Sequence, residues 1–316
     1  MKLHSVSNCS LVSGSERPFD LLIFACGFES RCLDIFNKLI KERPTIKLST
    51  SVLAFEEDLD NAQRKKNEAR FTSYGITPDI FSQKESLAIK EWMFNELKTI
   101  TKKISSPRIF VDISSMSRPW YAGIIQALRA FDSDIKIELV FGYTVAAEIT
   151  NVEKYPPSEI VGPVPGFTAL ESPDKPTALV LSLGVHPGRG LGLREYLDPQ
   201  LSLLVTSGNK ALGNYLPMVN SANADLFDRI PQSDKFTCDI TDPAGTFLIL
   251  RSLCNGLVEE WRIVLASVGP KMVGLIFFLL AVVDPRLSVW RVSAGKKALP
   301  QDVKGIGQVY LTTTWE

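Results

Sequence analysis

Residues 19–40 read FDLLIFACGFESRCLDIFNKLI. The apolar run that ends at Cys26 has the length and composition of a buried β-strand, and the residues after Arg31 repeat apolar side chains at helical spacing. Gly27 lies between the two, where the chain has to turn from a strand into a helix. The stretch therefore predicts a strand, a glycine turn and an amphipathic helix.

The second half of the chain opens in the same way. Residues 177–197 read TALVLSLGVHPGRGLGLREYL, again a strand, a glycine-rich turn and a helix. Each half then continues to a second such unit, RIFVDISSMSRPWYAGIIQALRAF in the first and WRIVLASVGPKMVGLIFFLLAVV in the second. The first and second turns have the same separation in both halves, which indicates an internal repeat.

Apolar strands that alternate with helices predict parallel sheets covered on both faces. We therefore expect an α/β protein with two tandem Rossmann-like sheets, doubly wound, mostly parallel and related by internal duplication. The first domain would be residues 1–150, the linker the Pro- and Gly-rich residues 151–176, and the second domain residues 177–316. The alternative is that two unrelated domains of this class look alike because both alternate strands and helices.

The composition narrows the class of protein. A chain of 316 residues with 45% hydrophobic residues is long enough for two cores. Its 35 basic and 35 acidic residues cancel, which disfavours binding to extended duplex nucleic acid. The N-terminus lacks the apolar core of a signal peptide, and residues 272–283 are too short to span a bilayer, so we predict a cytoplasmic protein without a membrane segment. The five cysteines form no CxxC pair and are expected to be reduced thiols, mostly in the core.

The polar turns are the candidate binding sites, because doubly wound sheets bind ligands at the carboxyl ends of their strands. The first turn contains Gly27, Glu29 and Arg31, and it opens a helix whose N–H groups suit an anion. The Arg31 guanidinium matches phosphate geometry. An equally weighted alternative is a structural ion pair of Arg31 with Glu29 or Asp34.

The second turn, DISSMSRP at residues 112–119, is the stronger candidate. It combines hydroxyl donors with a cation ahead of a helix, namely Ser114, Ser115, Ser117 and Arg118. The alternative is structural: Ser117 caps the helix and Asp112 bonds to nearby backbone.

In the second half, Gly184, Arg189 and Lys271 occupy the corresponding turns, with Lys271 in the place of Arg118. His186 is open to two interpretations, a general base or a turn histidine bonded to backbone. The chain has neither a GxGxxG fingerprint nor a Walker A motif, and no obvious carboxylate cluster, so we predict no cofactor and no metal. The charged run at residues 56–70 is expected to be a solvated helix.

The turns ACGFESR and DISSMSR, with SLGVHPGRG and ASVGPK in the second half, resemble those of CARF-type Rossmann-like sensor domains of prokaryotic antiviral systems. The resemblance implies that these loops contact a cyclic oligonucleotide. Such sensors usually join two chains and append an effector domain, whereas here both halves lie in one polypeptide.

We therefore predict a pseudo-dimeric protein that binds a phosphate-rich nucleotide, such as a cyclic oligonucleotide, between its two halves and acts in antiviral defence. A fragment of residues 1–150 would then lose binding more than stability. One alternative is a phosphodiesterase or nucleotide hydrolase, with Glu29 or Asp112 as the acid or base. Another is a defence effector or toxin subunit that acts with a protein partner from a defence operon.

Overall fold

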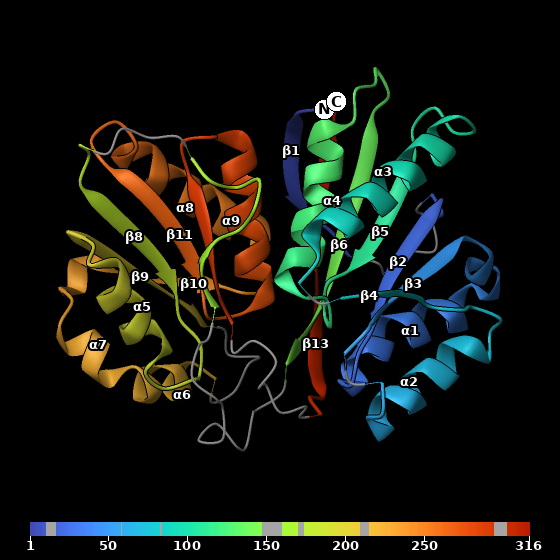
Figure 1. The fold of residues 1–316 in the computed structure, drawn as a ribbon, viewed down its shortest axis with the longest axis horizontal. Coiled ribbons are helices and arrows are strands. Elements are labelled where there is room, and N and C mark those ends of the chain that lie inside the picture. The colour runs from blue at the N-terminus through green and yellow to red at the C-terminus, as the bar shows by residue number, and fades with distance from the viewer. Residues whose placement is uncertain are drawn as a thin grey trace. The chain divides into compact units, whose positions relative to one another are not determined.

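The computed structural model describes residues 1–10, 17–57, 59–82, 84–146, 160–169, 174–208, 215–293 and 302–316. They form two units, each a sheet flanked by helices (Figure 1). The first unit contains the described residues up to 146 and from 302 onward, and the second contains those from 160 to 293. The predicted α/β class with two Rossmann-like sheets is confirmed.

The described sheet of the first unit has the strand order β1-β13-β6-β5-β2-β3-β4. Its parallel strands are β2 (Leu21–Cys26), β3 (Thr50–Phe55), β4 (Asp79–Phe81), β5 (Arg108–Asp112) and β6 (Ile137–Ala146). An antiparallel strand, β13 (Gly305–Trp315), lies between β6 and β1 (Leu3–Asn8). The helices are α1 (Asp34–Glu42), α2 (Ala62–Thr72), α3 (Ser86–Thr101) and α4 (Arg118–Ala130).

The described sheet of the second unit has the order β10-β9-β8-β11-β12-β7. Its parallel strands are β8 (Thr177–Ser182), β9 (Leu201–Gly208), β10 (Lys235–Asp239), β11 (Arg262–Ser267) and β12 (Ser288–Ser293), and β7 (Ile160–Pro163) is antiparallel to β12. The helices are α5 (Arg189–Leu197), α6 (Tyr215–Ala222), α7 (Ala224–Asp228), α8 (Pro243–Leu257) and α9 (Lys271–Val283).

The two units repeat one topology. The order β4-β3-β2-β5-β6 in the first matches β10-β9-β8-β11-β12 in the second. Helices α4 and α9 both have 13 residues and begin at Arg118 and Lys271. The strand order thus supports the internal duplication. The strand order reverses between β2 and β5 in the first unit and between β8 and β11 in the second. Such sheets bind ligands at this point.

Two domain boundaries differ from those that the sequence predicts. Strand β13 pairs with β6 from Trp315↔Ile137 to Gly305↔Ala146, so the C-terminus belongs to the first sheet and not to a second domain of residues 177–316. Strand β7 lies within the predicted linker but pairs with β12; residues 151–159 and 170–173 of that linker lie outside the described residues. The sequence pattern failed here because an alternating strand can pair with either sheet.

Aromatic and aliphatic side chains fill the cores. Strand β2 is buried along its whole length, and Phe24, Phe36 and Phe71 pack with ring centroids 4.8 to 6.3 Å apart. Helix α9 is buried from Met272 to Ala281, which agrees with a buried helix in place of a membrane segment. Within the described residues, no helix combines the length and apolar character needed to cross a bilayer.

Four of the five free cysteines are buried, and Cys9 is half-buried. Burial raises the pKa of the Cys26 and Cys254 thiols to about 12, and it also raises that of Cys32. We therefore expect iodoacetamide at about pH 8 to alkylate Cys9 alone in the folded chain, because the thiolate is the reacting species. Peptide mass spectrometry before and after unfolding tests this, and early alkylation of Cys26 would contradict it.

Candidate functional site

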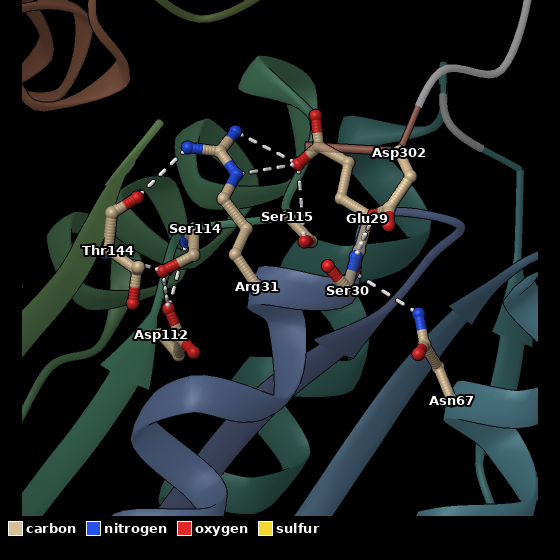
Figure 2. A network of polar contacts seen from close by, with 9 residues as sticks. All are labelled: Glu29, Ser30, Arg31, Asn67, Asp112, Ser114, Ser115, Thr144 and Asp302. Carbon is tan, nitrogen blue, oxygen red and sulfur yellow. Dashed lines mark hydrogen bonds and ion pairs between the residues drawn. The ribbon is translucent and has the colours of Figure 1, made fainter. Parts of the chain in front are cut away.

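One polar network joins the loops after β2 and β5 at the carboxyl edge of the first sheet (Figure 2). Arg31 donates through Nε and Nη2 to Glu29 Oε2, at 3.0 and 2.9 Å. Its Nη1 donates to the Thr144 carbonyl at 2.9 Å. The Ser115 hydroxyl donates to the same oxygen of Glu29 at 3.3 Å. The structure therefore brings Glu29, Arg31 and Ser115 together, as the sequence predicts.

The Arg31 side chain bonds to other groups of the protein. Its side chain is 4% exposed and forms the ion pair with Glu29 that the sequence left as an alternative. Burial by itself lowers the pKa of the guanidinium, but Glu29 and Tyr143 outweigh this and raise it, so Arg31 stays charged. Its first role is to fix the loop after β2 against strand β6, and its direct contact with a ligand stays a prediction.

Asp112 fixes the start of the second loop. Its Oδ1 accepts hydrogen bonds from the backbone N–H of Ser114, at 2.9 Å, and from the Ser114 hydroxyl. The Ser114 oxygen in turn accepts from the Thr144 N–H at 2.7 Å. Asp112 is 2% exposed, which agrees with the structural interpretation in which this carboxylate bonds to nearby backbone.

Arg118 opens helix α4, with Pro119 in the first turn. Ser117 is the N-cap residue, but its side chain makes no capping hydrogen bond, so the capping alternative for Ser117 is wrong. Arg118 is half-buried beside Tyr121. Burial raises the pKa of the Tyr121 phenol, and the charge of Arg118 partly offsets that rise.

Two tyrosines lie near the arginines of this edge. The pKa of Tyr121 is also raised by Tyr143, and the Arg31 guanidinium carbon lies 5.7 Å from the centroid of the Tyr143 ring. Arg31, Arg118 and the two phenols therefore form one cluster at the ends of β5 and β6. The tyrosines could not be identified from the sequence, since nothing in an apolar helix or strand marks such a residue as part of a site.

A buried asparagine secures the first loop in each unit. Asn67 donates to the carbonyl oxygens of Gly27 and Glu29, at 2.8 and 3.1 Å, and Asn223 donates to that of Gly184 at 2.9 Å. Asn67 lies 40 residues after Gly27 and Asn223 lies 39 after Gly184. An alignment of the two halves of the sequence would place Asn67 and Asn223 at matching positions and so identify both. The prediction that residues 56–70 form a solvated helix is wrong at Asn67, because the side chain of Asn67 is fully buried.

Asp302 is a further residue that the sequence analysis missed. Its Oδ1 accepts from the backbone N–H of Ser30 at 2.6 Å, and Arg31 N–H donates to the Val303 carbonyl at 3.4 Å. The segment ahead of β13 thus contacts the first loop from a position 272 residues away in the chain.

In the second unit, Gly184 has a packing role. A Cβ at Gly184 would lie 2.4 Å from the Val268 carbonyl oxygen, and one at Gly269 would lie 2.3 Å from that of Leu183. The loops after β8 and β11 therefore cross in backbone contact, and both positions need glycine. The role of Gly184 as a ligand residue stays a prediction.

The predicted cations of the second unit, Arg189 and Lys271, are the first residues of α5 and α9. Both are half-buried at the carboxyl edge of their sheet, and Gly188 precedes Arg189 with φ 73°. The imidazole Nδ1 of His186 is buried in the same loop. Among the residues that the structure describes, no three or more His, Cys, Asp or Glu side chains are grouped to hold a metal ion.

Comparisons with known proteins give no family. No family model matches the chain, and no curated protein matches it. Among solved structures it is similar to UDP-GlcNAc 2-epimerase from Neisseria meningitidis bound to UDP-GlcNAc, with 11% identity, a TM-score of 0.23 and 88% of each chain covered. A T. thermophilus 16S rRNA methyltransferase in complex with AdoMet and guanosine gives 12% identity and a TM-score of 0.21, over 96% of this chain and 90% of that one. Scores this low carry no argument about the ligand of this chain.

Proposed function

We propose that this protein binds a nucleotide through its phosphate groups, at the loops on the carboxyl edge of its first sheet. The supporting observation is the cluster of Arg118, Arg31, Tyr121 and Tyr143, next to the Ser114–Ser117 turn and at the start of α4. A helix N-terminus with a cation and hydroxyl donors is a favourable place for phosphate.

The neighbouring carboxylate favours a nucleotide over a simple anion. Glu29 is partly exposed and lies next to the cations. A carboxylate repels phosphate but accepts hydrogen bonds from ribose hydroxyls, as acidic residues do in many Rossmann-like sites. A ligand that carries both groups fits this edge best. We extend the proposal to a cyclic oligonucleotide and a role in antiviral defence on the strength of the loop resemblance.

Binding is better supported than hydrolysis. Both candidate acid–base groups already accept hydrogen bonds: Asp112 from Ser114, and Glu29 from Arg31 and Ser115. A general base has to reach the proton it removes. Asp112 is too buried for that, so a hydrolase would have to use Glu29.

We expect Arg118→Ala to weaken nucleotide binding by roughly 1.5–3 kcal/mol, because it removes one charge-assisted contact. Native mass spectrometry of the purified protein identifies a co-purified nucleotide, and calorimetric titration with it compares the variants. Arg129→Ala is the matched control, since it removes the same charge from the last turn of the same helix. Equal affinity of wild type and Arg118→Ala would remove this loop from the site.

A further inference from the structure

Three serine hydroxyls at one edge of the second sheet are buried and have no hydrogen-bond partner among the residues that the structure describes. They belong to Ser182, Ser207 and Ser267, whose side chains are at most 3% exposed. Ser182 and Ser267 are the last residues of β8 and β11, and Ser207 is the penultimate residue of β9. All three therefore lie at the carboxyl ends of adjacent strands, around the point where the strand order reverses.

The register places the three hydroxyls on one face. In parallel strands, paired residues direct their side chains to the same face, and side chains two positions apart share a face. Ser182 pairs with Ser267 and also with Val205, which is two positions before Ser207. The opposite face carries the apolar cluster that contains Leu181, Leu204 and Ala266.

A cation without a partner lies on the next strand. Leu265 pairs with Val289, so Arg291 shares the face of Ser267 on strand β12. Arg291 is half-buried, and among the described residues it has no hydrogen-bond or ion-pair partner. Burial lowers the pKa of its guanidinium, and no carboxylate opposes that effect.

Helix α9 begins beside these hydroxyls. Its first residue is Lys271, and a Cβ at Gly269, just ahead of it, would lie 2.8 Å from Ser182 Oγ. The acidic residues between β10 and α8 already accept hydrogen bonds: Asp239, at the end of β10, from Thr241, and Asp242, the N-cap residue of α8, from the Gly245 N–H at 2.8 Å.

The first unit carries buried apolar residues at the matching positions. Gly27 corresponds to Gly184, so the pair Ile23↔Val111 matches the pair Val180↔Leu265. Ser182 and Ser267 therefore correspond to Ala25 and Ile113, which carry no hydroxyl. A buried hydroxyl without a partner costs stability, so a cluster of such hydroxyls points to a group that they bind.

We propose that the carboxyl edge of the second sheet binds a phosphate group, with the hydroxyls of Ser182, Ser207 and Ser267 as hydrogen-bond donors and Arg291 as the counter-charge. This site is separate from the Arg118 cluster and goes beyond the nucleotide binding proposed for the first unit. A tetrahedral oxyanion accepts several hydrogen bonds at once, which matches donors that come from adjacent strands.

The test uses the full chain with inorganic phosphate in one arm and the four ribonucleoside 5′-triphosphates in the other, by thermal shift and calorimetry. We expect Ser267→Ala to weaken phosphate binding by about 2- to 10-fold and Arg291→Met by about 10-fold or more. The matched controls are Ser202→Ala, a partnerless buried hydroxyl near the amino end of β9, and Arg286→Met, an exposed arginine after α9; both should bind like wild type. Without ligand, both alanine variants should melt no lower than wild type, because they remove an unsatisfied hydroxyl.

Binding in just one of the two arms supports the site and shows whether its ligand is free phosphate or a nucleotide. Absence of binding in both arms would overturn the proposal, as would equal losses in Ser202→Ala and Ser267→Ala. Loss of phosphate binding in Arg118→Ala, with Arg291→Met unaffected, would place the phosphate in the first unit instead. The outcome is independent of the proposed function, because a protein that binds no nucleotide can still pass the phosphate arm.

Discussion

Arg31→Ala is expected to lower the free energy of unfolding by about 3 kcal/mol. The substitution leaves the Glu29 carboxylate without its two hydrogen bonds from Arg31 and removes the donor to the Thr144 carbonyl. Removing one partner of a buried ion pair typically costs about 3–5 kcal/mol, and the partial exposure of Glu29 places this pair at the lower end. The loss should appear as a lower urea midpoint with the slope of the transition unchanged.

The matched control for Arg31 is Arg286→Ala. Arg286 also forms two ion-paired contacts, at 2.7 Å to Glu259 and 2.8 Å to Asp284, but it is exposed. Exposed pairs contribute little to stability, so this variant should unfold nearly as wild type does. The double variant Arg31→Met/Glu29→Leu should recover much of the loss, since apolar replacement of a whole pair is often tolerated. A cost below about 1 kcal/mol for Arg31→Ala would mean that the network does not stabilise the loops.

Local pattern predicted the strands and turns well. The apolar runs at β2 and β8 are buried throughout, and Arg118 and Lys271 both begin helices, because strand, turn and helix signals lie within a few residues of one another. The repeat predicted that the two sheets share one topology, and their strand orders match. The position of β13 was not predicted, because its partner β6 is remote in the sequence and pairing between distant strands leaves no local signal.

The site could be predicted only in part, for a related reason. Glu29, Arg31 and Ser115 were assigned to neighbouring loops, but the sequence left open whether Arg31 pairs with Glu29 or with a ligand. Thr144 contributes through its backbone carbonyl, and Asp302 through its carboxylate, which accepts from the Ser30 N–H; both contacts span a long sequence separation that no local pattern encodes. Ser182, Ser207 and Ser267 lie at the ends of apolar strands, where a small residue is common. Only the structure distinguishes them, because it gives their hydroxyls no hydrogen-bond partner among the described residues.

The C-terminal strand determines which part of the chain can fold alone. The sequence predicts that residues 1–150 alone lose binding more than stability, but that fragment lacks β13, which lies between β6 and β1 (Figure 1). Strand β13 buries the side chains of Val309, Tyr310, Leu311 and Trp315. At roughly 1.5–3 kcal/mol for each buried apolar side chain, their loss amounts to about 6–12 kcal/mol. That is comparable with the whole stability of a domain, about 5–15 kcal/mol.

We therefore expect residues 1–150 alone to show no cooperative unfolding transition. A matched fragment should fold: Gly305 pairs with Ala146, so residues 1–146 joined to residues 305–316 by a short glycine-containing loop would close β6 and β13 into a hairpin. The loop replaces the second unit, which lies between these strands in the sequence. Circular dichroism with urea titration compares the two fragments, and Trp315→Ala in the joined fragment should reduce its stability by about 3–5 kcal/mol. A cooperative transition of residues 1–150 at the midpoint of the joined fragment would show that β13 is dispensable, and the first unit would then end at β6 as the sequence predicts.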